Sequence, residues 1–264
     1  MKNHRLPALL LGLAVVFGGW AYALYGQENG PQLSLVGDFL VDTSRVAEFE
    51  AGLKDLLGYM EKHGFPFGLG TSTTDDGHYY MVYTMKNYAD VDFWHKAWEE
   101  LGQKAGPENV RALDRRILAS VIERVYQFWV YRPDISFLPE KERLKPEEIG
   151  YYTWDFVWLV PGKEEEFEAV NKEWIALSKA KKARDPFLTC VGGLGTRMPV
   201  YLWIEYGKSA ADYAAAEEKF WKAMGEDGAA LSKKTRALIQ RMDSKTGQFR
   251  PDLSYAPEET KPKK

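Results

Sequence analysis

Apolar and polar residues follow two different periods along this chain. In residues 34–41, which are rich in Leu, Val and Phe, apolar and polar positions alternate, and this period of two predicts a strand. In residues 45–62 the apolar positions are instead three and four apart, which predicts an amphipathic helix; they are Val46, Phe49, Leu53, Leu56 and Met60. The chain therefore mixes strands with helices.

The same two periods predict the elements that follow. A hairpin of residues 65–71 and 79–84 is expected around the turn Asp75-Asp76-Gly77. Two more helices then carry apolar stripes, which are Val91, Trp94, Trp98 and Leu101 in one and Val110, Leu113, Ile117 and Val121 in the other. Residues 125–132 close the unit as a strand. The resulting order of elements is β-α-β-β-α-α-β.

The second half of the chain shows a similar series of elements. Its first helix begins at Glu164 and carries an apolar stripe of Phe167, Val170, Trp174 and Leu177. Its hairpin joins residues 187–193 to residues 200–206, and its last strand is expected at residues 244–250.

An internal repeat accounts for this second series. The segment YRPDISFLPE at residues 131–140 returns as FRPDLSYAPE at residues 249–258, and the same shift of 118 positions carries EFEA at 48–51 onto EFEA at 166–169. With small gaps, three more pairs match in the same order: GDF at 37–39 with WDF at 154–156, GLGT at 68–71 with GLGT at 193–196, and Trp98 and Gly102 with Trp221 and Gly225. The sequence therefore predicts two copies of one unit, residues 34–140 and 151–258, with a linker at 141–150 and a disordered tail at 259–264.

Duplication suggests how the two units pack. A four-stranded antiparallel sheet with helices on one face leaves its other face to be covered, and a second copy can cover it. By element order, duplication and aromatic content, the chain resembles the dimeric α+β barrel superfamily, in which two ferredoxin-like units pack sheet to sheet. The fold expected is therefore α+β, with two tandem ferredoxin-like β-α-β-β-α-α-β units forming a fused dimeric α+β barrel. The resemblance implies no single activity, because the superfamily includes cofactor-free monooxygenases, haem-degrading oxygenases and chlorite dismutase-like haem proteins.

Composition excludes several classes of function. The 264 residues include 35 Lys and Arg against 38 Asp and Glu, so the chain lacks the basic excess of a nucleic-acid-binding protein. The single cysteine, Cys190, cannot form an internal disulfide and is expected to be a buried thiol. Asp75, Asp76 and His78 share one tight turn, where three ligands rarely converge, so no metal site is expected.

The first residues have the layout of a secretory signal peptide. Residues 1–23 start with basic side chains, continue as an apolar run and end in the small-x-small triplet Ala21-Tyr22-Ala23. We expect cleavage after Ala23 and export to the periplasm or the exterior. The alternative is that residues 6–25 stay attached as a membrane anchor, since about 20 apolar residues suffice to cross a bilayer.

Two types of side chain are candidates for chemistry. Asp38 and Asp155 are expected at matched places in the first strands, where each either pairs with a base such as Arg132 or Arg250 or lines a polar cavity. His95 lies between two tryptophans of a helix, where it is either a plain surface histidine or a group facing a haem iron or an aromatic substrate. Haem-degrading members of the superfamily resembled here also use a helical histidine beside an aromatic residue.

The tryptophans favour an apolar ligand pocket between sheet and helices. Most of the nine are expected in the core, but some can line such a pocket and bind a planar hydrophobic molecule. The candidate ligand-binding residues are His95, Trp98, Asp155, Glu205 and Trp221. One copy is expected to hold the ligand, because the copies differ at paired positions: Tyr83 against Glu205, and His95 against Glu218.

These observations favour an exported protein that binds a small apolar or aromatic molecule, with no catalytic residues assigned and no cofactor. One alternative is a cofactor-independent oxygenase or a haem-binding or haem-dependent enzyme of the same superfamily. Another is a structural or protein-interaction module, in which the repeated Arg-Pro-Asp tails and an exposed sheet edge contact a partner.

Overall fold

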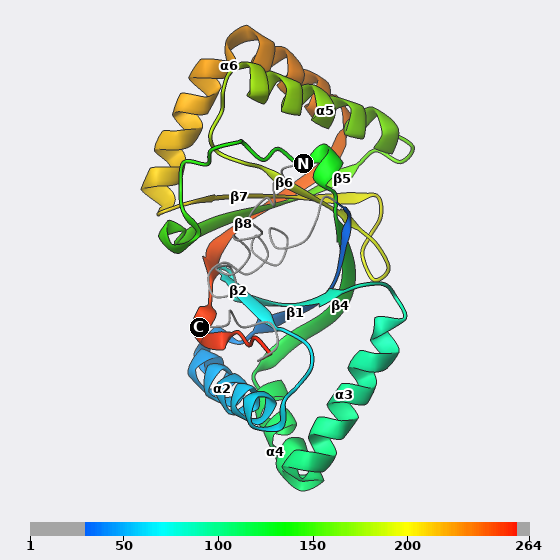
Figure 1. Cartoon of the computed structure of the whole chain (residues 1–264). Coiled ribbons are helices and arrows are strands. Elements are labelled where there is room, and N and C mark those ends of the chain that lie inside the picture. Colours follow the sequence, from blue (N-terminus) through cyan, green and yellow to red (C-terminus); the bar gives the residue numbers. More distant parts are fainter. Residues whose placement is uncertain (1–29, 258–264) are drawn as a thin grey trace, which may run out of the picture.

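A computed structural model describes residues 30–257. The expected signal peptide or anchor and the tail at residues 259–264 lie outside these residues, so both stay predictions. Eight strands close into one barrel, with α2, α3 and α4 on one side of it and α5 and α6 on the other (Figure 1). The elements are β1 (Gln32–Val41), α2 (Val46–His63), β2 (Gly70–Thr74), β3 (His78–Met85), α3 (Asp90–Ala105), α4 (Pro107–Leu118), β4 (Val121–Tyr131), β5 (Tyr151–Leu159), α5 (Glu164–Ala180), β6 (Leu188–Gly192), β7 (Val200–Gly207), α6 (Ala210–Leu238) and β8 (Ile239–Phe249).

The two halves have the same strand order. It is β4-β1-β3-β2 in the first half and β8-β5-β7-β6 in the second, and antiparallel pairing of β2 with β8 and of β4 with β6 closes the barrel. In the second half the expected pair of helices forms the two parts of α6, which meet at a kink at Gly225, whose backbone is not helical and has a φ of 56°. Because the ring closes, the described strands leave no exposed edge of the kind that the interaction-module alternative requires.

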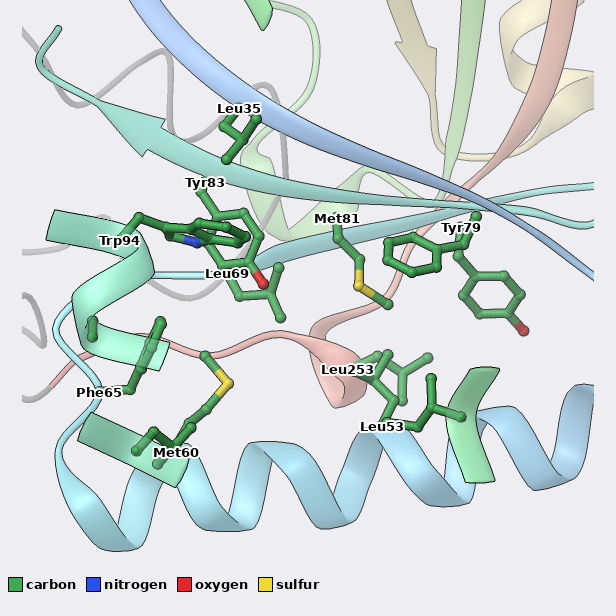
Figure 2. Packing of buried hydrophobic residues seen from close by; sticks show 14 of the residues in the cluster. Leu35, Leu53, Met60, Phe65, Leu69, Tyr79, Met81, Tyr83, Trp94 and Leu253 are labelled. Carbon is green, nitrogen blue, oxygen red and sulfur yellow. The ribbon is translucent and has the colours of Figure 1, made fainter. Parts of the chain in front are cut away.

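The helices pack on the outer face of the barrel through the stripes that their sequences predict. Phe49, Leu53 and Met60 of α2 are buried, and the helix ends at Gly64, which has a left-handed φ of 63°. Figure 2 shows Leu53 facing Leu253, which comes from the segment after β8. The first helix–sheet core therefore includes the C-terminal end of the second half.

One predicted strand is misplaced. The apolar residues Phe65 and Leu69 suggested a strand at 65–71, whereas β2 is the polar segment Gly70–Thr74. Phe65 and Leu69 are buried in the helix–sheet core instead. The hydroxyl of Thr71 in β2 is satisfied by the carbonyl oxygen of Leu253 at 2.6 Å, a long-range contact that no local pattern reveals.

The strand register corrects two correspondences within the repeat. Pairing shifts between Leu40 and Val41 in β1 and between Trp158 and Leu159 in β5, positions that are 118 residues apart. With that shift, Asp155 corresponds to Gly37, not to Asp38. Two isolated bridges correct the second correspondence. Leu69 bridges Tyr255, and Phe187 bridges Phe137, so Leu69 and Phe187 take equivalent places in the two halves. GLGT at 68–71 therefore corresponds to residues 186–189 and not to residues 193–196.

The two aspartates consequently face opposite sides of the barrel. Asp38 shares its face of β1 with Val36, which belongs to the barrel interior, and its Oδ1 lies 2.7 Å from Nδ1 of His78. Asp155 shares its face of β5 with Val157, which packs under the helices. The expected pairing of these aspartates with Arg132 and Arg250 is therefore wrong.

The two arginines instead join the halves to each other. Arg132, at the end of β4, donates to Glu168 of α5 at 2.9 Å and to Asp134 at 2.8 Å. Arg250, at the end of β8, donates in the same way to Glu50 of α2 and to Asp252, both at 2.8 Å. The tail of each half thus binds the first helix of the other half, which accounts for the repeated Arg-Pro-Asp motif.

Aromatic and aliphatic side chains fill the barrel interior. Tyr80 and Trp154 face each other there with ring centroids 6.3 Å apart, and Trp129 meets Phe156 at 5.8 Å. Cys190 is 1% exposed in the same cluster, as its apolar surroundings in the sequence predict, and burial raises the pKa of its thiol. No helix within residues 30–257 has the length and apolar character to span a membrane.

Candidate functional site

Each half contains a cavity between its sheet and its helices. The first cavity, of about 630 Å³, lies against α3, α4 and β4, and the second, of about 570 Å³, lies against α5, α6 and β8. His95 and Trp98 line the first cavity together, and Trp221 lines the second. The predicted pocket between sheet and helices is therefore present twice.

In the first cavity, the predicted residues differ in exposure. His95 is exposed at the surface of α3, whereas Trp98 is partly buried against Phe65, with ring centroids 4.7 Å apart. The indole nitrogens of Trp94 and Trp98 are buried and have no acceptor among the described residues. Two cations, Arg111 and Arg124, and one carboxylate, Asp114, also belong to the cavity wall, and Arg111 pairs with Glu108 at 2.6 Å. This cavity therefore combines aromatic faces with charged groups of both signs.

The second cavity has a more aromatic wall. Trp203 of β7 forms part of its floor, Trp174 of α5 stands over it, and the ring of Trp221, whose residue is 41% exposed, lies edge-on to Trp174 at 5.8 Å. Asn171 of α5 also lines it and is only 2% exposed, yet its amide nitrogen has no partner among the described residues. The indole nitrogen of Trp203 is likewise buried and has no acceptor among the described residues.

These unpaired donors point to a ligand or to ordered water. A buried polar group without a hydrogen bond costs about 1–3 kcal/mol, so native structures rarely leave one unsatisfied. The sequence carries a signal for Asn171, because its spacing of four from Phe167 and three from Trp174 places a polar side chain within the apolar stripe of α5.

Glu205 occupies a small cavity of about 30 Å³ beside the second cavity. It lies two residues after Trp203 on the same face of β7, and the hydroxyl of Tyr213 donates to its Oε2 at 2.5 Å. Burial raises the pKa of the Glu205 carboxyl to about 7, although the Tyr213 hydrogen bond acts in the opposite direction. This places the pKa where a carboxylate can act as a general base at neutral pH.

Asp155 lies on the neighbouring strand, opposite Trp203 in the β5–β7 pair. Burial raises its pKa above the ordinary value, and a hydrogen bond from Ser244 lowers it in part. Asp155 is not among the residues that line the two large cavities. Of the predicted ligand-binding residues of the second half, only Trp221 lines the large cavity, whereas Glu205 lines the small cavity beside it and Asp155 lines neither.

Phe220 connects the parts of this region. It lines both the second cavity and the small cavity of Glu205.

Helices α3 and α6 begin alike, because Asp90 and Asp212 each accept a hydrogen bond from the backbone nitrogen four residues earlier. Counted from these starts, Trp98 corresponds to Phe220 rather than to Trp221, and His95 corresponds to Glu217 rather than to Glu218.

His78 lies outside the turn in which the sequence placed it with Asp75 and Asp76. His78 begins β3, and its imidazole lies between Asp38 at 2.7 Å and Asp76 at 3.8 Å. Across residues 30–257, His, Cys, Asp and Glu side chains form no group of three or more that could hold a metal ion.

No family model and no curated protein matches the sequence. Three kinds of solved structure resemble the fold. A monooxygenase-like protein from Lactobacillus acidophilus has a TM-score of 0.51 at 10% identity, over 86% of this chain and 97% of its own. An anthrone oxidase-like protein has a TM-score of 0.55 at 12% identity, over 83% and 91%. A chlorite dismutase from Candidatus Nitrospira defluvii has a TM-score of 0.52 at 9% identity, over 86% and 94%.

At such low identity these likenesses concern the fold, and the fold agrees with the barrel described above. All three neighbours belong to one structural superfamily, and their structures match this chain over most of its length. The chain therefore has the fold of the dimeric α+β barrel superfamily.

Proposed function

We propose that the protein is a cofactor-independent oxygenase whose substrate is a planar, largely apolar carbon acid bound in the second cavity. The observation that carries this proposal is Glu205, a partly buried carboxyl with a pKa of about 7 beside an aromatic cavity. The fold neighbours described as monooxygenase-like and anthrone oxidase-like favour oxidation over binding alone.

The side chains around Glu205 suit proton abstraction followed by oxidation. Glu205 accepts a proton from a methylene group whose carbanion is conjugated with a carbonyl, and Tyr213 holds the carboxyl by its hydrogen bond of 2.5 Å. The N–H groups of Asn171 and Trp203 belong to the wall of the second cavity and have no acceptor among the described residues, and in this proposal they donate to the oxygen that becomes negative. The electron-rich carbanion then reduces dioxygen, so that one methylene group and one dioxygen molecule give one carbonyl group and one water molecule. Substrate reaches Glu205 past Phe220, which lines both cavities.

Replacement of Glu205 tests this function. With anthrone as the probe under air, we expect Glu205→Gln to lower kcat about 100-fold, because it removes the general base. In the parent, kcat/KM should rise through about pH 7, the pKa of the carboxyl, and this rise should disappear in the variant. Oxygen uptake and product absorbance measure both effects. Glu218→Gln, which changes an exposed carboxyl on α6, is the matched control.

Stability separates a catalytic loss from misfolding. A carboxyl whose pKa is raised by folding stabilises the protein below its unfolded value of 4.5, and that contribution is lost as the pH rises through 7. Glu205→Gln should therefore be at least as stable as the parent at pH 8. A parent protein that binds anthrone without consuming oxygen contradicts the oxygenase and leaves ligand binding alone. A Glu205→Gln variant that keeps full activity shows that Glu205 is not the base.

Haem binding in the first cavity is the second candidate function. His95, in the wall of the first cavity, would hold the iron of a haem there. Arg111 and Arg124 of the same wall suit the carboxylates of the haem. A bound haem would supply one-electron and oxygen chemistry at its iron.

Haemin titration tests this second candidate. If haem binds here, a shifted Soret band should form, and His95→Ala should weaken binding about tenfold or more. His63→Ala, at the end of α2 and outside the cavity, should bind like the parent. Equal spectra for the parent and His95→Ala would rule out His95 as the ligand.

We also propose that the two halves are tandem copies of one ferredoxin-like unit, residues 34–140 and 151–258. The shared strand order supports this, as do the register shifts 118 residues apart. The reciprocal contacts of Arg132 and Arg250 also repeat with that spacing.

A further inference from the structure

A cationic cavity lies beside the small cavity of Glu205. It has a volume of about 210 Å³ and is formed by Arg143, the turn after α5 and the first half of α6. Four further cations stand in its wall around Arg143: Lys181, Lys182, Arg184 and Lys219. No part of the proposed oxidation uses this cavity.

Hydrogen bonds to two carboxylates hold the guanidinium of Arg143, and one of its nitrogens forms none. Its Nε donates to Asp185 at 2.6 Å, and its Nη1 donates to Asp212 at 2.9 Å. Its Nη2 is buried and has no acceptor among the described residues. Two carboxylates therefore fix the direction of the guanidinium, and its third nitrogen has no acceptor among the described residues.

Positive charge exceeds negative charge in the wall. Five cations face only two carboxylates there, and both carboxylates are engaged by Arg143. Lys181 pairs with Asp227 at 3.2 Å, but Lys182 and Lys219 form no ion pair in the part of the chain that the structure describes. Lys182 is also held at a left-handed φ of 55°, which few residues other than glycine adopt.

The cationic cavity adjoins the proposed site. Asp185, Ala216 and Phe220 line both it and the small cavity of Glu205, and Phe220 also lines the large second cavity. A ligand that extends past Phe220 can therefore place an apolar body in the aromatic cavity and a polar end beside Arg143.

We propose that this cavity binds a phosphate-like anionic group carried by the substrate. Guanidinium and ammonium groups are the usual partners of phosphate in proteins. The inference rests on the proposed function for the place of the apolar body, and it narrows the substrate class to planar apolar molecules with an anionic end.

Calorimetric titration of the full chain tests this with 1-naphthyl phosphate and 1-naphthol. The phosphate ester should bind about tenfold tighter than the alcohol, and the difference should shrink in high salt. The double variant Lys182→Asn and Lys219→Met should weaken binding of the ester about tenfold and leave binding of the alcohol unchanged. Asn suits the left-handed backbone at position 182. Lys222→Met, which lies on the same helix but outside the cavity, should change neither.

Each outcome decides one proposal separately. Equal affinity for ester and alcohol, or an equal effect of Lys222→Met and the double variant, overturns the anion site. If the ester binds as expected but anthrone is not oxidised, the anion site stands and the oxygenase fails. If Glu205→Gln abolishes oxidation while the lysine variants bind the ester normally, the oxygenase stands and the anion site fails.

Discussion

Gly247→Ala should lower the free energy of unfolding by about 4 kcal/mol and open the barrel between β2 and β8. A Cβ at this position would overlap the carbonyl oxygen of Thr73 and lie 2.8 Å from both the carbonyl carbon of Thr73 and the Cα of Thr74. These neighbours are backbone atoms, so no side-chain rotation relieves the overlap. The seam has only three residue pairs, and Gly247 belongs to one of them.

Gly58→Ala is the matched control. Gly58 lies inside α2, and a Cβ there would meet no atom within 4 Å. Because alanine is a better helix former than glycine, the free energy of unfolding of this variant should rise by about 0.5–1 kcal/mol. Urea unfolding followed by circular dichroism measures both variants. If Gly247→Ala proves as stable as the parent, the strands at this seam do not approach as closely as described.

The reciprocal arginine contacts should contribute the second large effect. Arg132→Met and Arg250→Met should each destabilise the protein by about 2–3 kcal/mol, because each leaves a mostly buried glutamate without its cation. Arg250 and Glu50 are both 18% exposed at the side chain. The two contacts are separate, so their effects should add in the double variant. Arg111→Met, which removes an exposed pair with Glu108, should cost less than about 0.5 kcal/mol.

The Arg250 contact should also depend on pH. Its hydrogen bond to Glu50 lowers the pKa of that carboxyl below the ordinary value of 4.5. The ion pair therefore stabilises the fold above pH 4.5, and this contribution is lost as the pH falls through the lowered pKa. The stability difference between the parent and Arg250→Met should shrink in acid. A difference that stays constant from pH 7 to pH 3 would mean that the arginine acts through packing alone.

The sequence by itself determined the elements and the plan of the fold. Periods of two and of three to four located most strands and helices, because one face of each element is buried and burial imposes that spacing. The repeat at 131–140 and 249–258 predicted two halves covering each other's sheets. The pocket between sheet and helices followed from this plan, and His95, Trp98 and Trp221 do line such cavities.

Only the tertiary structure decided which face each polar residue takes and what it meets there. A slip of one residue in register moves a side chain to the other face of a sheet, and for this reason Asp38 and Asp155 point to opposite sides. The pKa of Glu205 depends on Tyr213 and on burial under α6, contacts formed by folding rather than by a motif. Arg132 and Arg250 bind glutamates of the opposite half because closure of the barrel brings each tail to the other half's first helix.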